Sequence, residues 1–208
     1  MHILHVDSSP RSDRSISRQL TKEFVMSWKT AFPDGSVIYR DLGHYPVPFI
    51  DEAWIAASFT SPEQLTPELE SRLEVSNALI DELFAADVWL FGIPMYNYSI
   101  PANFKAYIDQ IVRVRRTFIV NDRGEYEGLV SNKKVVIITA RGGIFSPGTP
   151  DAAFDFQEPL LRTVFNLIGI TEIMFIHAEN LAGGAEVRQQ SLEKARAEIQ
   201  NLIQLGEI

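Results

Sequence analysis

The chain has 208 residues, of which 46% are hydrophobic and 22% are charged, and its formal net charge is −8. It contains no cysteine, which excludes disulfides, thiolate nucleophiles and thiolate-bound metal centres, so any redox chemistry has to come from a bound cofactor. The negative charge argues against a nucleic-acid-binding protein, and no apolar run approaches the roughly 20 residues that a membrane span needs. The length favours a single domain over residues 1–208.

The four histidines are scattered through the sequence without a metal-binding spacing, and we expect no metal site. The amino terminus enters a predicted strand at once, without the basic and apolar segments of a secretion signal. We therefore expect a cytoplasmic protein that binds neither membranes nor nucleic acids.

Strands and helices are predicted to alternate along the chain. The expected strands cover residues 2–7, 36–42, 87–93, 135–140 and 172–177. The expected helices cover residues 16–31, 66–86, 102–112, 153–167 and 186–203. A short helical piece is expected in the irregular stretch 53–66, and a hairpin in 117–129. This alternation predicts an α/β, flavodoxin-like, doubly wound five-stranded parallel sheet of order 2-1-3-4-5, with helices on both faces.

Three turns follow the first, third and fourth predicted strands, and in this fold they meet at one edge of the sheet. In the first turn, Ser9, Arg11, Ser15 and Ser17 offer hydroxyl groups, a cation and the free amides of a helix start. That combination is typical of a phosphate-binding site, although an ordinary serine-rich helix cap is the alternative. The sequence contains no glycine-rich dinucleotide fingerprint and no P-loop motif.

The other two turns suit a flat ligand with polar edges. The third strand is followed by Pro94, Met95, Tyr96, Asn97 and Tyr98. These side chains would lie along a planar ring, or they would simply pack in a core or an interface. The fourth strand ends in Arg141, Gly142 and Gly143, which leave backbone amides uncovered or form a plain strand-to-loop turn. The coincidence of three such turns at one edge favours a ligand site.

These segments resemble the FMN-dependent NADH:quinone oxidoreductase and FMN-dependent NADH-azoreductase family. The resemblance runs through essentially the whole chain and rests on Ser8-Ser9-Pro10-Arg11, Ser15-Ile16-Ser17, Pro94-Met95-Tyr96-Asn97-Tyr98, Phe104-Lys105-Ala106-Tyr107-Ile108-Asp109 and Arg141-Gly142-Gly143-Ile144. It implies a flavodoxin-like fold, non-covalent FMN and a homodimer with its sites at the interface. It further implies ping-pong transfer of two electrons as a hydride, from NADH or NADPH through FMN to quinones or aromatic azo compounds.

The resemblance also implies the cofactor contacts. The phosphate would be held by Ser9, Arg11, Ser15, Ile16 and Ser17, and the isoalloxazine would be lined by Pro94, Met95, Tyr96, Asn97 and Tyr98. The pyrimidine edge would be contacted by Ala140, Arg141, Gly142 and Gly143; many family members have serine in place of Ala140, which leaves backbone contacts there. No catalytic acid or nucleophile is expected, because the flavin carries the chemistry.

Phe118, Tyr126 and Phe145 are candidates for apolar walls on the substrate side, with ordinary loop packing as the alternative. The helix 102–112 would pack either on its twin in a dimer or inside its own chain. A flavodoxin-type electron carrier would share the fold and the FMN but would act through a protein partner. A receiver-like signalling domain would need an acidic cluster after the first strand, where Asp7 stands alone.

Overall fold

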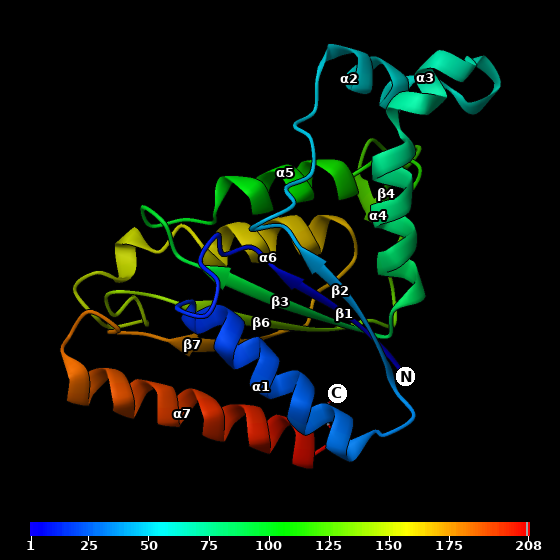
Figure 1. The fold of residues 1–208 in the computed structure, drawn as a ribbon. Coiled ribbons are helices and arrows are strands. Elements are labelled where there is room, and N and C mark those ends of the chain that lie inside the picture. Colours follow the sequence, from blue (N-terminus) through cyan, green and yellow to red (C-terminus); the bar gives the residue numbers. More distant parts are fainter. Residues whose placement is uncertain (207) are drawn as a thin grey trace.

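A five-stranded parallel sheet forms the centre of the computed structural model, which describes residues 1–206 and 208 (Figure 1). In chain order its strands are β1 (His2–Asp7), β2 (Ser36–Asp41), β3 (Val88–Pro94), β6 (Lys134–Ala140) and β7 (Ile173–Ala178). In space they lie in the order β2-β1-β3-β6-β7, with every neighbouring pair parallel. Because β6 and β7 are the fourth and fifth strands of this sheet, the predicted order 2-1-3-4-5 is confirmed.

Helices cover the two faces of the sheet. In chain order they are α1 (Ile16–Ala31), α2 (Glu52–Phe59), α3 (Pro67–Arg72), α4 (Glu74–Ala85), α5 (Ala102–Ile111), α6 (Glu158–Leu167) and α7 (Ala185–Gln204). The helices α1 and α7 pack on one face, and α4, α5 and α6 pack on the other (Figure 1). The strand β3 is fully buried because Val88 and Leu90 face the first group while Trp89 and Phe91 face the second. Burial on both faces explains its unbroken apolar sequence.

The apolar side of α5 is used inside its own chain. Phe104, Tyr107 and Ile111 are fully buried and join the core formed with β3 and α6. Of the two possibilities that the sequence leaves for this helix, the structure therefore supports intramolecular packing.

Two helix boundaries differ from the sequence-based expectation. The helix expected over 66–86 is broken at Leu73, which is buried against Trp54 of α2, so that α3 and α4 are separate. The helix expected over 153–167 begins only at Glu158, because the Asp155 carboxylate accepts hydrogen bonds from the amides of Gln157 (2.9 Å) and Glu158 (3.0 Å). At Leu73 a tertiary contact overrides a continuous helical pattern, whereas at Asp155 a local side-chain cap sets the start of the helix.

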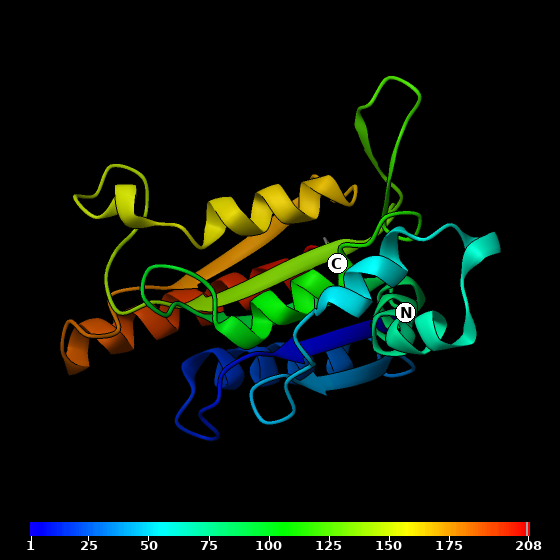
Figure 2. The same ribbon diagram turned by 90° about the horizontal axis from the view of Figure 1, so that it is seen from above.

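The predicted hairpin is present as β4 (Phe118–Val120) and β5 (Tyr126–Gly128), an antiparallel pair that projects from the body of the molecule (Figure 2). Its base is fixed where the amide of Val130 donates to the carbonyl of Ile168 at 2.9 Å, just before β7 begins. The hairpin therefore leaves the molecule near the amino ends of the strands. Within the described residues, none of the helices combines the length and the apolar character that crossing a bilayer requires.

Candidate functional site

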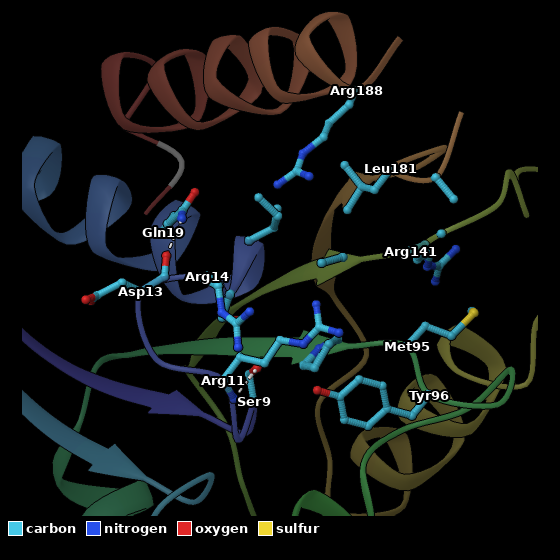
Figure 3. A pocket seen from close by; sticks show the side chains of 16 residues that line it. Ser9, Arg11, Asp13, Arg14, Gln19, Met95, Tyr96, Arg141, Leu181 and Arg188 are labelled. Atoms are coloured by element: carbon cyan, nitrogen blue, oxygen red, sulfur yellow. Dashed lines mark hydrogen bonds between the residues drawn. The ribbon is translucent and has the colours of Figure 1, made fainter. Parts of the chain in front are cut away.

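A cavity of about 770 Å³ lies at the carboxyl ends of β1, β3 and β6 (Figure 3). The sequence-predicted residues that line it are Ser9, Arg11, Ser15, Ile16, Pro94, Met95, Tyr96, Ala140, Arg141 and Gly142. The cavity is also lined by residues that the sequence did not single out, namely Asp13, Arg14, Gln19, Leu181, Ala182 and Arg188. Its volume falls in the range of small-molecule and cofactor sites.

The first turn presents an anion-binding helix start to this cavity. Ser15 caps α1, because its Oγ accepts a hydrogen bond from the amide of Arg18 at 3.4 Å. The next two amides, of Ile16 and Ser17, have no acceptor among the described residues. Ser9 and Ser17 are buried, and the hydroxyl of Ser17 lies 3.2 Å from that of Ser15. Free amides at the positive end of a helix dipole favour a phosphate or a similar anion.

Arg18 supports the first turn through hydrogen bonds to its backbone, a role that no sequence pattern predicts. Its Nε and Nη2 donate to the carbonyl oxygen of Ser9 at 3.0 and 2.6 Å, and its guanidinium is paired with Asp41 at the end of β2. Burial raises the pKa of Asp41, but hydrogen bonds from Arg18 and His44 outweigh burial and lower this pKa to about 2. No local pattern marks Arg18, because its partners lie in two other segments of the chain.

The third turn is a tight two-residue hairpin beside the cavity. Tyr96 and Ser99 exchange two backbone hydrogen bonds of 2.9 and 3.1 Å, and both central residues, Asn97 (φ 47°) and Tyr98 (φ 68°), have left-handed backbones. That conformation is costly for a tyrosine. The side chains of Asn97 and Tyr98 are exposed and lie outside the cavity lining, and the Tyr98 ring centroid is 6.1 Å from that of Phe145.

The fourth turn presents backbone groups to the cavity, whereas the side chain of Arg141 is engaged inside the protein. Arg141 is only 1% exposed, and its guanidinium is bound by Gln157 (3.0 Å), Asp155 (3.0 Å) and Glu179 (3.2 Å). In Figure 3 its side chain points away from the cavity. The amide of Arg141 is also occupied, since it donates to the carbonyl of Ala178 at 2.8 Å. Arg141 therefore fixes the turn from inside the protein.

The two glycines that follow keep their amides available. Gly142 and Gly143 have no acceptor for their N–H groups among the described residues, while their carbonyl oxygens accept from Ala182 (3.1 Å) and Asn180 (2.8 Å). A Cβ added to Gly142 would meet only Ala182, at 3.9 Å. Since Gly142 lines the cavity, that methyl group would occupy space that a ligand needs.

The three expected substrate-side residues lie in different places. Phe145 is buried next to Gly143 at the cavity edge, without lining the cavity. Phe118 and Tyr126 lie on the projecting hairpin at the other end of the sheet, with their ring centroids 5.8 Å apart. A single chain does not bring these two rings to its own cavity.

The donors of the cavity suit a ligand that carries a phosphate at one end and a flat, polar-edged ring at the other. The amides of the first turn fit the phosphate, and Met95, Tyr96 and the amide of Gly142 surround the opposite end. The described part of the chain holds no group of three or more His, Asp or Glu side chains that could bind a metal ion. The residues present therefore fit a phosphorylated organic cofactor.

Comparisons with known proteins match the chain over nearly its full length. Residues 1–203 match a family described by its flavodoxin-like fold. FMN-dependent NADH:quinone oxidoreductase 1 of Trichormus variabilis is 62% identical over 203 residues, which cover 98% of this chain and 96% of that protein. An FMN-dependent NADH:quinone oxidoreductase of Nostoc punctiforme is 58% identical over 203 residues, with 98% of each chain covered.

Solved structures show the same arrangement. An azoreductase from Bacillus anthracis str. Sterne superposes with a TM-score of 0.85 at 26% identity, covering 97% of this chain and 99% of its own. An FMN-dependent NADH-azoreductase from Bacillus anthracis str. Ames Ancestor, solved in complex with FMN, superposes with a TM-score of 0.86 at 23% identity, over 98% and 97% of the two chains. The matched residues include every segment that lines the cavity.

Proposed function

Because this chain belongs to the FMN-dependent NADH:quinone oxidoreductase family, we propose that it transfers a hydride from NADH or NADPH to quinones, and to aromatic azo compounds, through bound FMN. The observation that carries the proposal is a single cavity with the free amides of α1 at one end and the free amide of Gly142 at the other. Residues 1–208 form the one FMN-binding domain in this proposal.

The protein holds the cofactor by its two ends. Ser9, Ser15 and the amides of Ile16 and Ser17 bind the phosphate, and Met95 and Tyr96 lie along the ring system. FMN, when bound, supplies the capacity to accept a hydride and to pass it on. The free amides of Gly142 and Gly143 would hold the pyrimidine edge of the cofactor, where backbone donors would favour negative charge.

Donor and acceptor use the same open side of the cavity in turn, which gives ping-pong kinetics. Asn97 and Tyr98 follow Tyr96 in the third turn, and in this proposal their side chains flank the open side. Hydroxyl groups do lie next to histidines, as in Ser12 beside His44 (3.2 Å) and Thr139 beside His177 (2.7 Å), but none of these four residues lines the cavity. In this proposal the protein positions the reactants and excludes water.

The active form in this proposal is a homodimer with a site at each end of the interface. Support comes from the hairpin, where Tyr126 is 69% exposed although it pairs with Phe118. Further aromatic side chains, Tyr45 (79%) and Phe49 (76%), are exposed after β2 ends. Several exposed aromatic rings are typical of a protein surface that a second subunit covers. In the dimer, Phe118 and Tyr126 reach the partner's cavity and form its apolar wall.

The experiment that tests the function is the visible spectrum of the purified protein, followed by addition of NADH without oxygen. We expect a yellow protein that loses its flavin absorbance with NADH and recovers it with a quinone. Steady NADH consumption with a quinone and no other protein distinguishes this enzyme from a flavodoxin-type carrier. A colourless protein that takes up no added FMN would contradict the proposal.

A further inference from the structure

Most of the arginine side chains in this chain are hydrogen-bonded within the protein. The sequence contains thirteen arginines. Among the described residues, those whose side chains make no hydrogen bond or ion pair are Arg11, Arg14, Arg72, Arg123 and Arg188. Three of these five, Arg11, Arg14 and Arg188, line the same cavity. Unpaired guanidinium groups are therefore concentrated at the candidate site.

This concentration is unusual for a chain whose net charge is −8. Arg141 also lines the cavity, but Asp155 and Glu179 neutralise it. Together with the carboxylate of Asp13, the three unpaired arginines leave two net positive charges on the lining. A phosphate monoester carries a charge of about −1.5 to −2 at neutral pH, so one phosphate group balances the cavity.

Arg188 comes from a part of the chain far from the phosphate-binding turn, yet its position is well fixed. It lies in the second turn of α7, a helix that packs on α1 through Leu192 and Ala195. The segment that leads into α7 is tied to the fourth turn, because the amides of Leu181 and Ala182 donate to the carbonyls of Arg141 and Gly142, both at 3.1 Å. From this helix the Arg188 side chain points into the cavity (Figure 3).

We infer that Arg188 binds the FMN phosphate together with Arg11 and Arg14, so that the carboxyl-terminal helix is part of the cofactor site. This inference rests on the proposed function. The guanidinium suits the role because it stays charged and can donate two parallel hydrogen bonds to phosphate oxygens. The binding also links α7 to α1 through the ligand, although residues 32–184 separate the two helices in the sequence.

The test compares two ligands that differ only in the phosphate. FMN and riboflavin are titrated into the apoprotein, for the unaltered chain and for Arg188→Ala, with fluorescence quenching as the readout. We expect Arg188→Ala to weaken FMN binding by about tenfold to a hundredfold, as for loss of a charge-assisted hydrogen bond, and to leave riboflavin binding unchanged. Arg188→Lys should recover part of the loss.

The control is Arg72→Ala, which removes another unpaired arginine, located on α3 outside the cavity. It should leave both affinities unchanged. A second readout is the salt dependence of FMN binding between about 0.05 and 0.5 M NaCl, which should be shallower in Arg188→Ala. If riboflavin binds too weakly to measure, the salt dependence shows whether Arg188 interacts with the phosphate. Thermal unfolding of the apoprotein should be unaltered by Arg188→Ala.

Three results would overturn the inference. A parallel loss of FMN and riboflavin affinity would show that Arg188 only supports the fold. Unchanged FMN affinity with an unchanged salt dependence would remove Arg188 from the site. A change confined to the KM for NADH would assign the guanidinium to the electron donor instead. If the unaltered chain binds neither flavin, the proposed function itself fails, and this outcome is distinct from all three.

Discussion

Gly43 and Gly142 both adjoin the turns that form the cavity, but a side chain would meet opposite surroundings at the two positions. A Cβ at Gly43 would lie 1.9 Å from the carbonyl oxygen of Ser9, so the chain after β2 can approach the first turn only as glycine. A Cβ at Gly142 would instead extend into the cavity without a clash. One glycine is therefore needed for folding, and the other leaves room for a ligand.

The two alanine substitutions form a matched pair. Gly43→Ala should lower the free energy of unfolding by about 1–3 kcal/mol, because a backbone has to move to relieve the clash. Gly142→Ala should leave urea unfolding of the apoprotein unchanged and weaken FMN binding about tenfold or more, because the methyl group occupies ligand space. Equal effects of the two substitutions on unfolding would contradict this distinction.

The elements around the first turn are held together by charge. Arg18 of α1 joins the carbonyl of Ser9, after β1, to Asp41 at the end of β2. Asp7 of β1 accepts from Thr21 of α1 at 3.0 Å and from Tyr39 of β2 at 3.1 Å. Three elements thus share one hydrogen-bonded network beneath the phosphate-binding turn, and the ionised carboxylate of Asp41 stabilises it.

This network predicts a specific acid sensitivity. The pKa of Asp41 in the folded protein is about 2, below its ordinary value of 3.8, so its ionised form favours folding. That contribution, on the order of 1–2 kcal/mol, is fully present above about pH 4 and is lost as the pH falls towards 2. The difference in unfolding free energy between the unaltered chain and Asp41→Asn should therefore shrink over this interval. A difference that stays constant from pH 6 to about pH 2 would contradict the assignment.

The arrangement of the whole molecule separates the cavity from the hairpin rings. The cavity lies at the carboxyl ends of the strands. The hairpin that carries Phe118 and Tyr126 projects near the amino ends (Figure 2). In a two-fold symmetric dimer, the hairpin of each subunit can serve the cavity of the other. A complete site then needs two chains.

Mixing two inactive variants tests this arrangement. One variant carries Phe118→Ala and Tyr126→Ala with an intact cavity, and the other carries Gly142→Val with an intact hairpin. Mixed dimers contain one site with an intact cavity and an intact hairpin, so mixing should restore up to about a quarter of the normal activity. Light scattering should give about twice the 23.5 kDa chain mass. Activity equal to the sum of the separate variants would show that the hairpin does not act on the partner.

The features of this protein that depend on local patterns were predictable from the sequence alone. The apolar run of β3, the cap at Ser15 and the alternation of elements were sufficient to predict the sheet order and the edge where the turns meet. The motifs after β1, β3 and β6 were sufficient to identify the family, as the full-length relatives confirm. Short-range periodicity and capping leave direct traces in neighbouring residues, which is why these features were predictable.

The directions of the charged side chains, by contrast, depend on contacts between segments that are distant in the sequence. Arg141 lines the cavity, as expected, but Asp155 and Glu179 hold its guanidinium inside the protein. Arg18 and Arg188 received no role from their local sequence, although one supports the first turn and the other lines the cavity. The local sequence around an arginine does not identify its partners, because folding brings those partners from distant segments. The break at Leu73 has the same origin, because the contact with Trp54 exists only in the folded chain.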